Sequence, residues 1–257
     1  MFTHAIARLP GANYADGLTR VDLGRPDLAE TLRQHAAYVD ALRDCGLAVE
    51  VLPADPAYPD GTFVEDTAIV LPGEAAILCR PGADSRRGEV AAVAAALRRH
   101  FPRPDAIAAP GTVDGGDICE AGDHVFIGVS HRTNAAGAAQ LAAWLQARGR
   151  TSSLVDIRGL DSILHLKSGI ACLAGERLLL IRELAQHPAF AGWARIVVDD
   201  DEAYAANAVQ VNQRVLIAAG HPKLAAALRD HGYRPLQLAM SEFAKLDGGL
   251  SCLSVRF

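Results

Sequence analysis

Three residues that lie far apart in the sequence carry side chains suited to nucleophilic chemistry: Cys252, His165 and Asp114. A cysteine nucleophile needs an acid or base within reach, and that group needs an orienting partner. Each of the three has a glycine nearby, and Cys252 follows Gly248 and Gly249, where the backbone can turn tightly and let another molecule come close. A free cysteine is more often a small buried hydrophobic residue, so the residue types alone do not establish a site. The spacing along the chain favours one.

The composition argues against several classes of function. The chain has 257 residues and is 50% hydrophobic, which suits one large domain, expected over residues 1–257, with ample core. A net charge of −5, a pI near 6.0 and the lack of a basic run argue against nucleic-acid binding. No apolar stretch suits a membrane-spanning helix, and the first residues lack the pattern of a signal peptide. Five widely spaced cysteines without a CxxC pair indicate neither structural zinc nor disulfides, so we expect a reduced, cytoplasmic protein.

Hydrophobic periodicity predicts a recurring order of elements. Helices are expected over 27–45, 85–100, 134–148 and 222–231, with a weaker one over 186–194. A short apolar run typical of a strand follows each helix, at 47–52, 106–109, 153–157, 195–198 and 234–238. Hairpin-like segments then begin near residues 64, 116, 166, 208 and 250, and their expected turn residues are Gly73, Gly122, Gly175 and Asn212. Residues 4–8 can supply the second strand of the fifth hairpin and close a ring.

The polar residues that enter these hairpins recur at regular intervals. Asp66, Asp114, His165, Asn207 and Cys252 are separated by 48, 51, 42 and 45 residues. A period of about 40–50 residues is typical of stacked or circular repeats. If the units surround an axis, the equivalent loops meet and the five side chains line one central pocket. Any α/β chain has polar loops at comparable intervals, so the spacing favours a ring without requiring it.

At these residues the chain resembles the dimethylarginine dimethylaminohydrolases, within the guanidine-modifying superfamily that includes arginine deiminases and amidinotransferases. The resemblance extends from end to end, and its motifs occur in order: Asp16-Gly-Leu-Thr19, Phe63-Val-Glu-Asp66, Arg80-Pro-Gly-Ala-Asp-Ser-Arg-Arg-Gly88, Pro110-Gly-Thr-Val-Asp-Gly-Gly-Asp117, Arg132-Thr-Asn134, Leu164-His-Leu-Lys-Ser168, Tyr204-Ala-Ala-Asn207 and Asp247-Gly-Gly-Leu-Ser-Cys252. Any one motif is weak, whereas all of them in order are highly specific. The resemblance implies an α/β fold, a five-bladed pseudosymmetric propeller of ββαβ units around a central active site.

The resemblance also implies a role for each candidate residue. Cys252 is the expected nucleophile, His165 the general acid and base, and Asp114 the carboxylate that orients the histidine. Glu65 and Asp66 are expected beside the substrate guanidinium, although one of these neighbours would support the fold instead if the two side chains faced opposite ways. The groups expected to hold the amino-acid end are the side chains of Asp60, Arg86 and Arg132 and the backbone carbonyls of Leu18 and Leu246. The segment 16–19 resembles a lid over the pocket.

The reaction implied by the resemblance is hydrolysis of asymmetric dimethylarginine and monomethylarginine to citrulline and an alkylamine, through a thiouronium on Cys252. A free thiol is mostly protonated at neutral pH. Because no lysine or arginine closely precedes Cys252, we expect the cationic substrate to supply much of the thiolate stabilisation. No metal or organic cofactor is expected, and Zn²⁺ held adventitiously by Cys252 and His165 should inhibit.

Two other functions stay open from the sequence. One is an arginine deiminase-like hydrolase of free or otherwise substituted arginine, which would release ammonia from free arginine. The other is a non-catalytic sensor that binds arginine without turning it over. In every case the expected partner is a small molecule, with neither nucleic acid nor membrane, and a homodimer stays open.

Overall fold

The computed structural model describes residues 1–257 and contains five three-stranded sheets with one shared topology. In each sheet an antiparallel hairpin is joined, after a helix, by a third strand that runs parallel to its neighbour. Four units follow the chain: β3 (Ala68–Leu71), β4 (Ala75–Leu78), α2 (Val90–Leu97) and β5 (Asp105–Ala106); β6 (Ile118–Ala121), β7 (His124–Val129), α3 (Ala135–Gln146) and β8 (Thr151–Asp156); β9 (Ile170–Leu173), β10 (Arg177–Leu180), α4 (Arg182–Ala185) and β11 (Arg195–Val197); β12 (Val209–Val211), β13 (Arg214–Ala218), α5 (Pro222–Asp230) and β14 (Pro235–Leu238).

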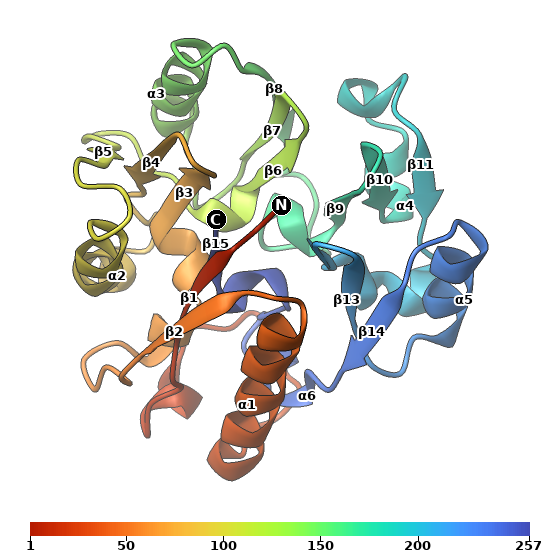
Figure 1. Cartoon of the computed structure of the whole chain (residues 1–257), viewed down its shortest axis with the longest axis horizontal. Helices are drawn as coiled ribbons and strands as arrows, with labels where there is room; N and C mark the ends of the chain where they lie inside the picture. Colours follow the sequence, from red (N-terminus) through yellow and green to blue (C-terminus); the bar gives the residue numbers. More distant parts are fainter.

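The fifth unit joins the two ends of the chain. It consists of β15 (Val255–Arg256), β1 (His4–Arg8), α1 (Leu28–Asp44) and β2 (Ala48–Leu52). In this sheet Ala5 faces Arg256 in antiparallel pairing, while His4 faces Ala48 in parallel pairing. Figure 1 shows the five sheets around a common centre, with α1, α2, α3 and α5 toward the outside. The α/β class and the closure of the ring by residues 4–8 are confirmed.

Local sequence signals explain most of the element boundaries. The side chain of Asp27 caps α1 by accepting a hydrogen bond from the Glu30 N–H at 2.8 Å, and Asn134 caps α3 in the same way. The four expected turn residues between hairpin strands all have positive φ: Gly73, Gly122, Gly175 and Asn212. Glycine and asparagine adopt this conformation more readily than other residues, so the register of each hairpin is encoded locally.

Three expected elements differ from the structure. The helix predicted over 186–194 is wrong: α4 ends at Ala185, and a separate 3-10 turn, Pro188–Phe190, follows it. Pro188 lacks an N–H and restricts the residue before it, which prevents a continuous helix there. The helix expected over 85–100 begins as a 3-10 turn (Asp84–Glu89), and the strand expected over 106–109 is reduced to β5. A short helix, α6 (Ser241–Ala244), was not expected.

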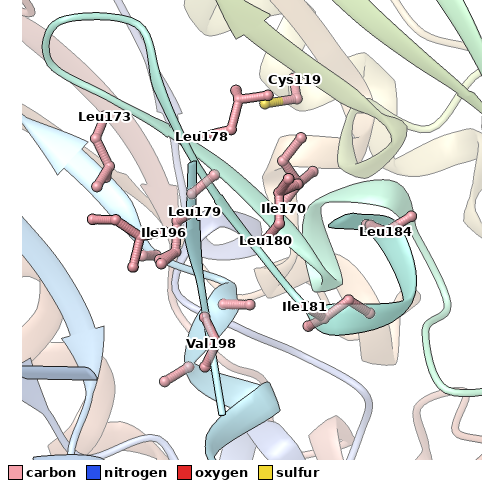
Figure 2. Packing of buried hydrophobic residues seen from close by; sticks show 14 of the residues in the cluster. Cys119, Ile170, Leu173, Leu178, Leu179, Leu180, Ile181, Leu184, Ile196 and Val198 are labelled. Carbon is pink, nitrogen blue, oxygen red and sulfur yellow. The ribbon is translucent and has the colours of Figure 1, made fainter. Parts of the chain in front are cut away.

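Buried apolar side chains fill the space between neighbouring units. The largest cluster contains 26 buried residues and spans three neighbouring sheets, β6–β8, β9–β11 and β12–β14. Figure 2 shows Leu180 of β10 beside Ile170 of β9 and Leu178 near Cys119, with Ile196 in β11 and Val198 directly after that strand. None of the helices combines the length and apolar character that spanning a bilayer requires.

A 3-10 turn precedes the first strand of every sheet, and these turns position the polar loop residues. Their bounds are Val64–Thr67, Gly115–Asp117, Leu166–Ser168, Asp200–Ala206 and Ser251–Leu253. The first turn contacts the second and the last, and the third contacts the second and the fourth. The five loop positions that recur in the sequence therefore meet near the axis of the ring.

Candidate active site

Cys252 lies in the last of these turns, directly before β15. The loop before Cys252 packs tightly against its neighbours at Gly248 and Gly249. A Cβ atom at Gly248 would lie 2.4 Å from the Phe63 ring, and one at Gly249 would lie 2.5 Å from the amide carbon of Asn207. Non-bonded carbon atoms do not approach this closely, so only glycine lets the cysteine loop lie against its neighbours.

His165 and Asp114 form a buried pair. The imidazole Nε2 donates to Asp114 Oδ2 at 3.0 Å, and the other carboxylate oxygen accepts the backbone N–H of Gly82 at 2.8 Å. Asp114 is fully buried, and both of its oxygens are used. The carboxylate therefore fixes the orientation of the imidazole ring.

The environment of His165 favours the imidazolium. Burial opposes a charge on the ring, but the carboxylates of Asp66, Asp117 and Asp114 outweigh it and raise the pKa of His165 from 6.5 to about 9. Asp117 itself accepts hydrogen bonds from the Ser130 hydroxyl at 2.7 Å and from the Leu166 N–H at 3.0 Å. At neutral pH the histidine is therefore protonated and can donate a proton to a leaving group.

Asp66 is an ionised carboxylate held by a buried arginine. It accepts from Arg86 Nη1 at 2.6 Å and from the backbone N–H of Gly116 at 2.8 Å. Burial opposes its charge, yet His165 and Arg86 lower the pKa of Asp66 to about 2. Arg86 also donates to Glu89 and to the carbonyl of Phe63, so its guanidinium is largely saturated by the protein.

One small cavity, of about 20 Å³, brings most of the predicted site residues together. Those that line it are Leu18, Asp60, Asp66, Arg86, Arg132, His165, Leu246 and Cys252. Asp114 does not line the cavity itself, but it binds His165, which does. Asp60 accepts the Leu18 N–H at 3.0 Å, and burial raises the pKa of Asp60. Arg132 forms no ion pair with the protein, so its guanidinium remains available for an anionic ligand.

Glu65 differs from the expectation that placed it beside the ligand. Its carboxylate accepts from Lys167 Nζ at 2.7 Å and from Arg256 Nη2 at 2.9 Å, and it is absent from the lining of the site cavity. It lines a separate cavity of about 480 Å³ instead. The neighbours Glu65 and Asp66 thus point into different environments, which is the arrangement in which one acid supports the fold.

Asp247 lines the site cavity although the sequence analysis gave it no role. It has a positive φ of 56° and accepts hydrogen bonds from the Arg20 N–H at 2.6 Å and from the Thr19 hydroxyl at 3.2 Å. It therefore ties the segment predicted as a lid to the loop that carries Cys252. Its place before two glycines is the one signal that marks it in the sequence.

The thiol of Cys252 is protonated in the ligand-free site. Burial, together with the negative charges of Glu65 and Asp66, raises the pKa of Cys252 to about 12. A bound cation beside the sulfur would act in the opposite direction and favour the thiolate.

Asp66, Asp114 and His165 place one potential metal-ligand atom each within 4.8 Å of one another. All three are already engaged: Asp66 with Arg86, Asp114 with Gly82 and His165 with Asp114 itself. A metal there would have to replace these hydrogen bonds, so the cluster fits proton transfer better than metal binding. Cys252 is not part of it.

The chain forms a ring of five sheets, and one cavity brings together a thiol, an imidazole and carboxylates. This combination is that of a guanidine-modifying enzyme. A family model described as arginine deiminase matches residues 85–203. A curated N(G),N(G)-dimethylarginine dimethylaminohydrolase from Pseudomonas aeruginosa is 44% identical over 258 residues, which cover 100% of both chains.

Two solved structures agree with this relation. DDAH from Pseudomonas aeruginosa, as a cysteine-to-serine mutant complexed with citrulline, has a TM-score of 0.96 and 43% identity with 100% of each chain covered. A dimethylarginine dimethylaminohydrolase with a histidine-to-glycine substitution, as an adduct with S-methyl-L-thiocitrulline, has a TM-score of 0.95 and 43% identity over 100% of each chain. The chain belongs to the dimethylarginine dimethylaminohydrolase family, and it is therefore an enzyme, a hydrolase.

Proposed function

We propose that the chain hydrolyses asymmetric dimethylarginine and monomethylarginine to citrulline and an alkylamine. The observation that carries the proposal is that one small cavity is lined by Cys252, His165 and Asp66 together. The relative from Pseudomonas aeruginosa bears this activity in its name, and a related structure holds citrulline. The five cysteines of this chain are free, which suits a reducing compartment, so we propose a cytoplasmic location.

Carboxylates select the substrate in this proposal. A guanidinium is a planar cation with forked N–H donors, and Asp66, ionised and buried, is suited to accept them. One such pair, at about 4 Å and an effective dielectric constant of about 20, is worth about 4 kcal/mol before desolvation. Asp60 offers a second acceptor at the wall of the cavity.

The amino-acid end of the substrate is held at the opposite part of the site. Arg132 has a guanidinium free of protein ion pairs and takes the main share of the α-carboxylate. Arg86, whose donors largely bind protein acceptors, contributes less. The backbone carbonyls of Leu18 and Leu246 receive the α-ammonium.

The first chemical step forms a carbon–sulfur bond. The bound cation lowers the pKa of the Cys252 thiol from about 12, its proton leaves to solvent, and the thiolate attacks the guanidinium carbon. An amide anion cannot leave, so His165, protonated at neutral pH, gives its proton to the departing alkylamine as the carbon–nitrogen bond breaks. The product of this step is an S-alkylthiouronium on Cys252.

The second step consumes water. His165 is now neutral and accepts a proton from a water molecule that attacks the same carbon. Collapse of the tetrahedral intermediate breaks the carbon–sulfur bond, and the hydroxyl proton leaves to solvent as the carbonyl forms. Citrulline departs, and the thiolate takes up a proton from solvent once the cation is gone. The adduct that the histidine-to-glycine relative forms with S-methyl-L-thiocitrulline is in line with an intermediate attached to the enzyme.

A citrulline assay on asymmetric dimethylarginine, monomethylarginine and arginine in parallel tests the proposal, with Cys252→Ser as the blank. We expect activity on the methylated substrates, little on arginine and none from the variant. His165→Gly should form the adduct slowly or accumulate it. Ammonia release from arginine as the main activity would identify a deiminase, and tight binding without citrulline would identify a sensor.

A further inference from the structure

The side-chain amide of Asn207 joins two loops that the proposed chemistry requires to converge. Its Nδ2 donates to the carbonyl of Lys167 at 3.0 Å and to the hydroxyl of Ser251 at 3.1 Å. Its Oδ1 accepts the backbone N–H of Ser251 at 2.9 Å. Lys167 is two residues after His165, and Ser251 directly precedes Cys252. Both N–H donors and the carbonyl oxygen of the amide are therefore used to connect the histidine loop with the cysteine loop.

The packing around Asn207 makes this connection rigid. The side chain is buried, and the backbone of Gly249 lies against the amide so closely that a Cβ there would be 2.5 Å from its carbon. Asn207 directly follows the fourth 3-10 turn, Asp200–Ala206, and its backbone N–H donates to the carbonyl of Tyr204, so a structured element fixes its backbone. A longer side chain would collide with Gly249, and a shorter one would not reach Lys167.

The position of Asn207 in the repeat is also informative. Of the five equivalent loop residues, Asp66, His165 and Cys252 line the site cavity and Asp114 binds the histidine. Asn207 is the exception. It does not line this cavity, and its side chain contacts neither His165 nor Asp114. Its side-chain hydrogen bonds go to the loops that carry His165 and Cys252, and it lines a neighbouring cavity of about 230 Å³ that shares Leu164, Asp247 and Gly248 with the site cavity.

We propose that Asn207 is a positioning residue that sets the separation between the imidazole of His165 and the sulfur of Cys252. The inference rests on the proposed function, because it concerns the two groups assigned to attack and to proton transfer. A displacement of about 1 Å between reacting groups lowers a rate by about 100-fold. Loss of the amide therefore lowers kcat by about 100-fold and leaves KM within about threefold, because the residues that hold the substrate stay in place.

The chain offers a matched control in Asn212. Its Nδ2 donates to the carbonyls of Phe2 and Cys45, and its Oδ1 accepts the Phe2 N–H, which is the same pattern of two donated bonds and one accepted bond. Asn207→Asp and Asn212→Asp thus each remove two donated hydrogen bonds. Those of Asn207 join the histidine and cysteine loops, whereas those of Asn212 lie away from these loops. Asn207→Ala removes the bonds without adding a charge.

The experiment measures kcat and KM on monomethylarginine, the melting temperature, and hydrogen exchange of the loops at 164–168 and 248–253. Both Asp variants should lower the melting temperature, and only the two Asn207 variants should lower kcat by about 100-fold with KM within about threefold. Exchange should increase in both loops of the Asn207 variants and in neither loop of Asn212→Asp. Equal loss of kcat in the Asn212 control, or unchanged kcat in Asn207→Ala, would overturn the inference.

Exchange separates this inference from the proposed function. If the wild-type chain turns over arginine and not monomethylarginine, the kcat comparison is made on arginine. If it turns over neither substrate, the proposed function fails, while unchanged exchange at 164–168 in Asn207→Ala would still overturn the link between the loops.

Discussion

Replacing Asp114 with asparagine tests the proposed acid–base chemistry at one defined pair of atoms. Both carboxylate oxygens accept a hydrogen bond, one from His165 Nε2 and one from the Gly82 N–H. An amide has only one oxygen, so Asp114→Asn can satisfy only one of these donors. With its oxygen toward Gly82, the amide turns an N–H group toward the imidazole and favours the neutral ring.

The structure gives the size of the effect. The pKa of His165 lies at about 9 instead of 6.5, which corresponds to a preference for the imidazolium of about 3 kcal/mol. Burial opposes this preference, and three carboxylates produce it. Loss of one adjacent charge lowers a pKa by about 1–3, so we expect the pKa of His165 in Asp114→Asn to fall to about 7. The unsatisfied donor should also lower the free energy of unfolding by about 1–3 kcal/mol.

The assay is the pH dependence of kcat on monomethylarginine, with the His165 resonance followed by NMR in parallel. The wild-type chain should lose activity as the pH rises through about 9, because deprotonated His165 cannot supply a proton to the leaving amine. Asp114→Asn should lose activity near pH 7, about two pH units below the wild-type chain. Asp123→Asn removes an exposed carboxylate far from the pair and should leave the profile unchanged. An Asp114→Asn profile that still falls near pH 9 would refute the assignment of Asp114 as the orienting acid.

Three further predictions follow from the same geometry. Alkylation of Cys252 by iodoacetamide in the ligand-free enzyme should keep rising by about tenfold per pH value toward pH 12, and a plateau below about pH 8 would contradict the buried thiol. The raised pKa of His165 contributes stability that is complete below pH 6.5 and is lost as the pH rises through 9, so urea unfolding should show a decline of about 3 kcal/mol over this window that is absent in His165→Gln. Arg86→Lys should lower the free energy of unfolding by at least about 2 kcal/mol, because an ammonium cannot replace the forked bonds to Glu89, whereas equal loss in the more exposed control Arg87→Lys would argue against this role.

The architecture was predictable because each repeat carries its own local signals. Turn residues such as Gly73 and Asn212, helix caps such as Asp27, and the alternation of helix with strand are written in short stretches of sequence. The recurrence of a polar residue before each hairpin then indicates that the units are equivalent. Where a local signal was misjudged, at Pro188, the expected helix was wrong even though the order of units was right.

The contacts of the site were harder to predict, because they depend on which way neighbouring side chains point. Glu65 and Asp66 are adjacent acids in one 3-10 turn, and nothing in the sequence distinguishes the carboxylate that binds Arg86 from the one that binds Lys167. Asp247 contacts a segment 227 residues away through the Arg20 N–H. Contacts between residues so far apart in the sequence form when the ring closes. No periodic pattern in the sequence indicates them.

The proposed nucleophile, Cys252, lies a few residues from the end of the chain, in the kind of segment that is poorly ordered unless other contacts hold it. Here β15 pairs with β1, and Arg256 in β15 binds Glu65, which also binds Lys167 of the histidine loop. Glu65 and Asn207 therefore connect the same two segments through different atoms, one by ion pairs and the other by amide hydrogen bonds. The acid that the sequence suggested as a ligand for substrate instead helps to hold the sulfur and the imidazole in register. Because both sets of contacts hold the last segment of the chain, the thiol of Cys252 keeps a defined position beside the histidine loop.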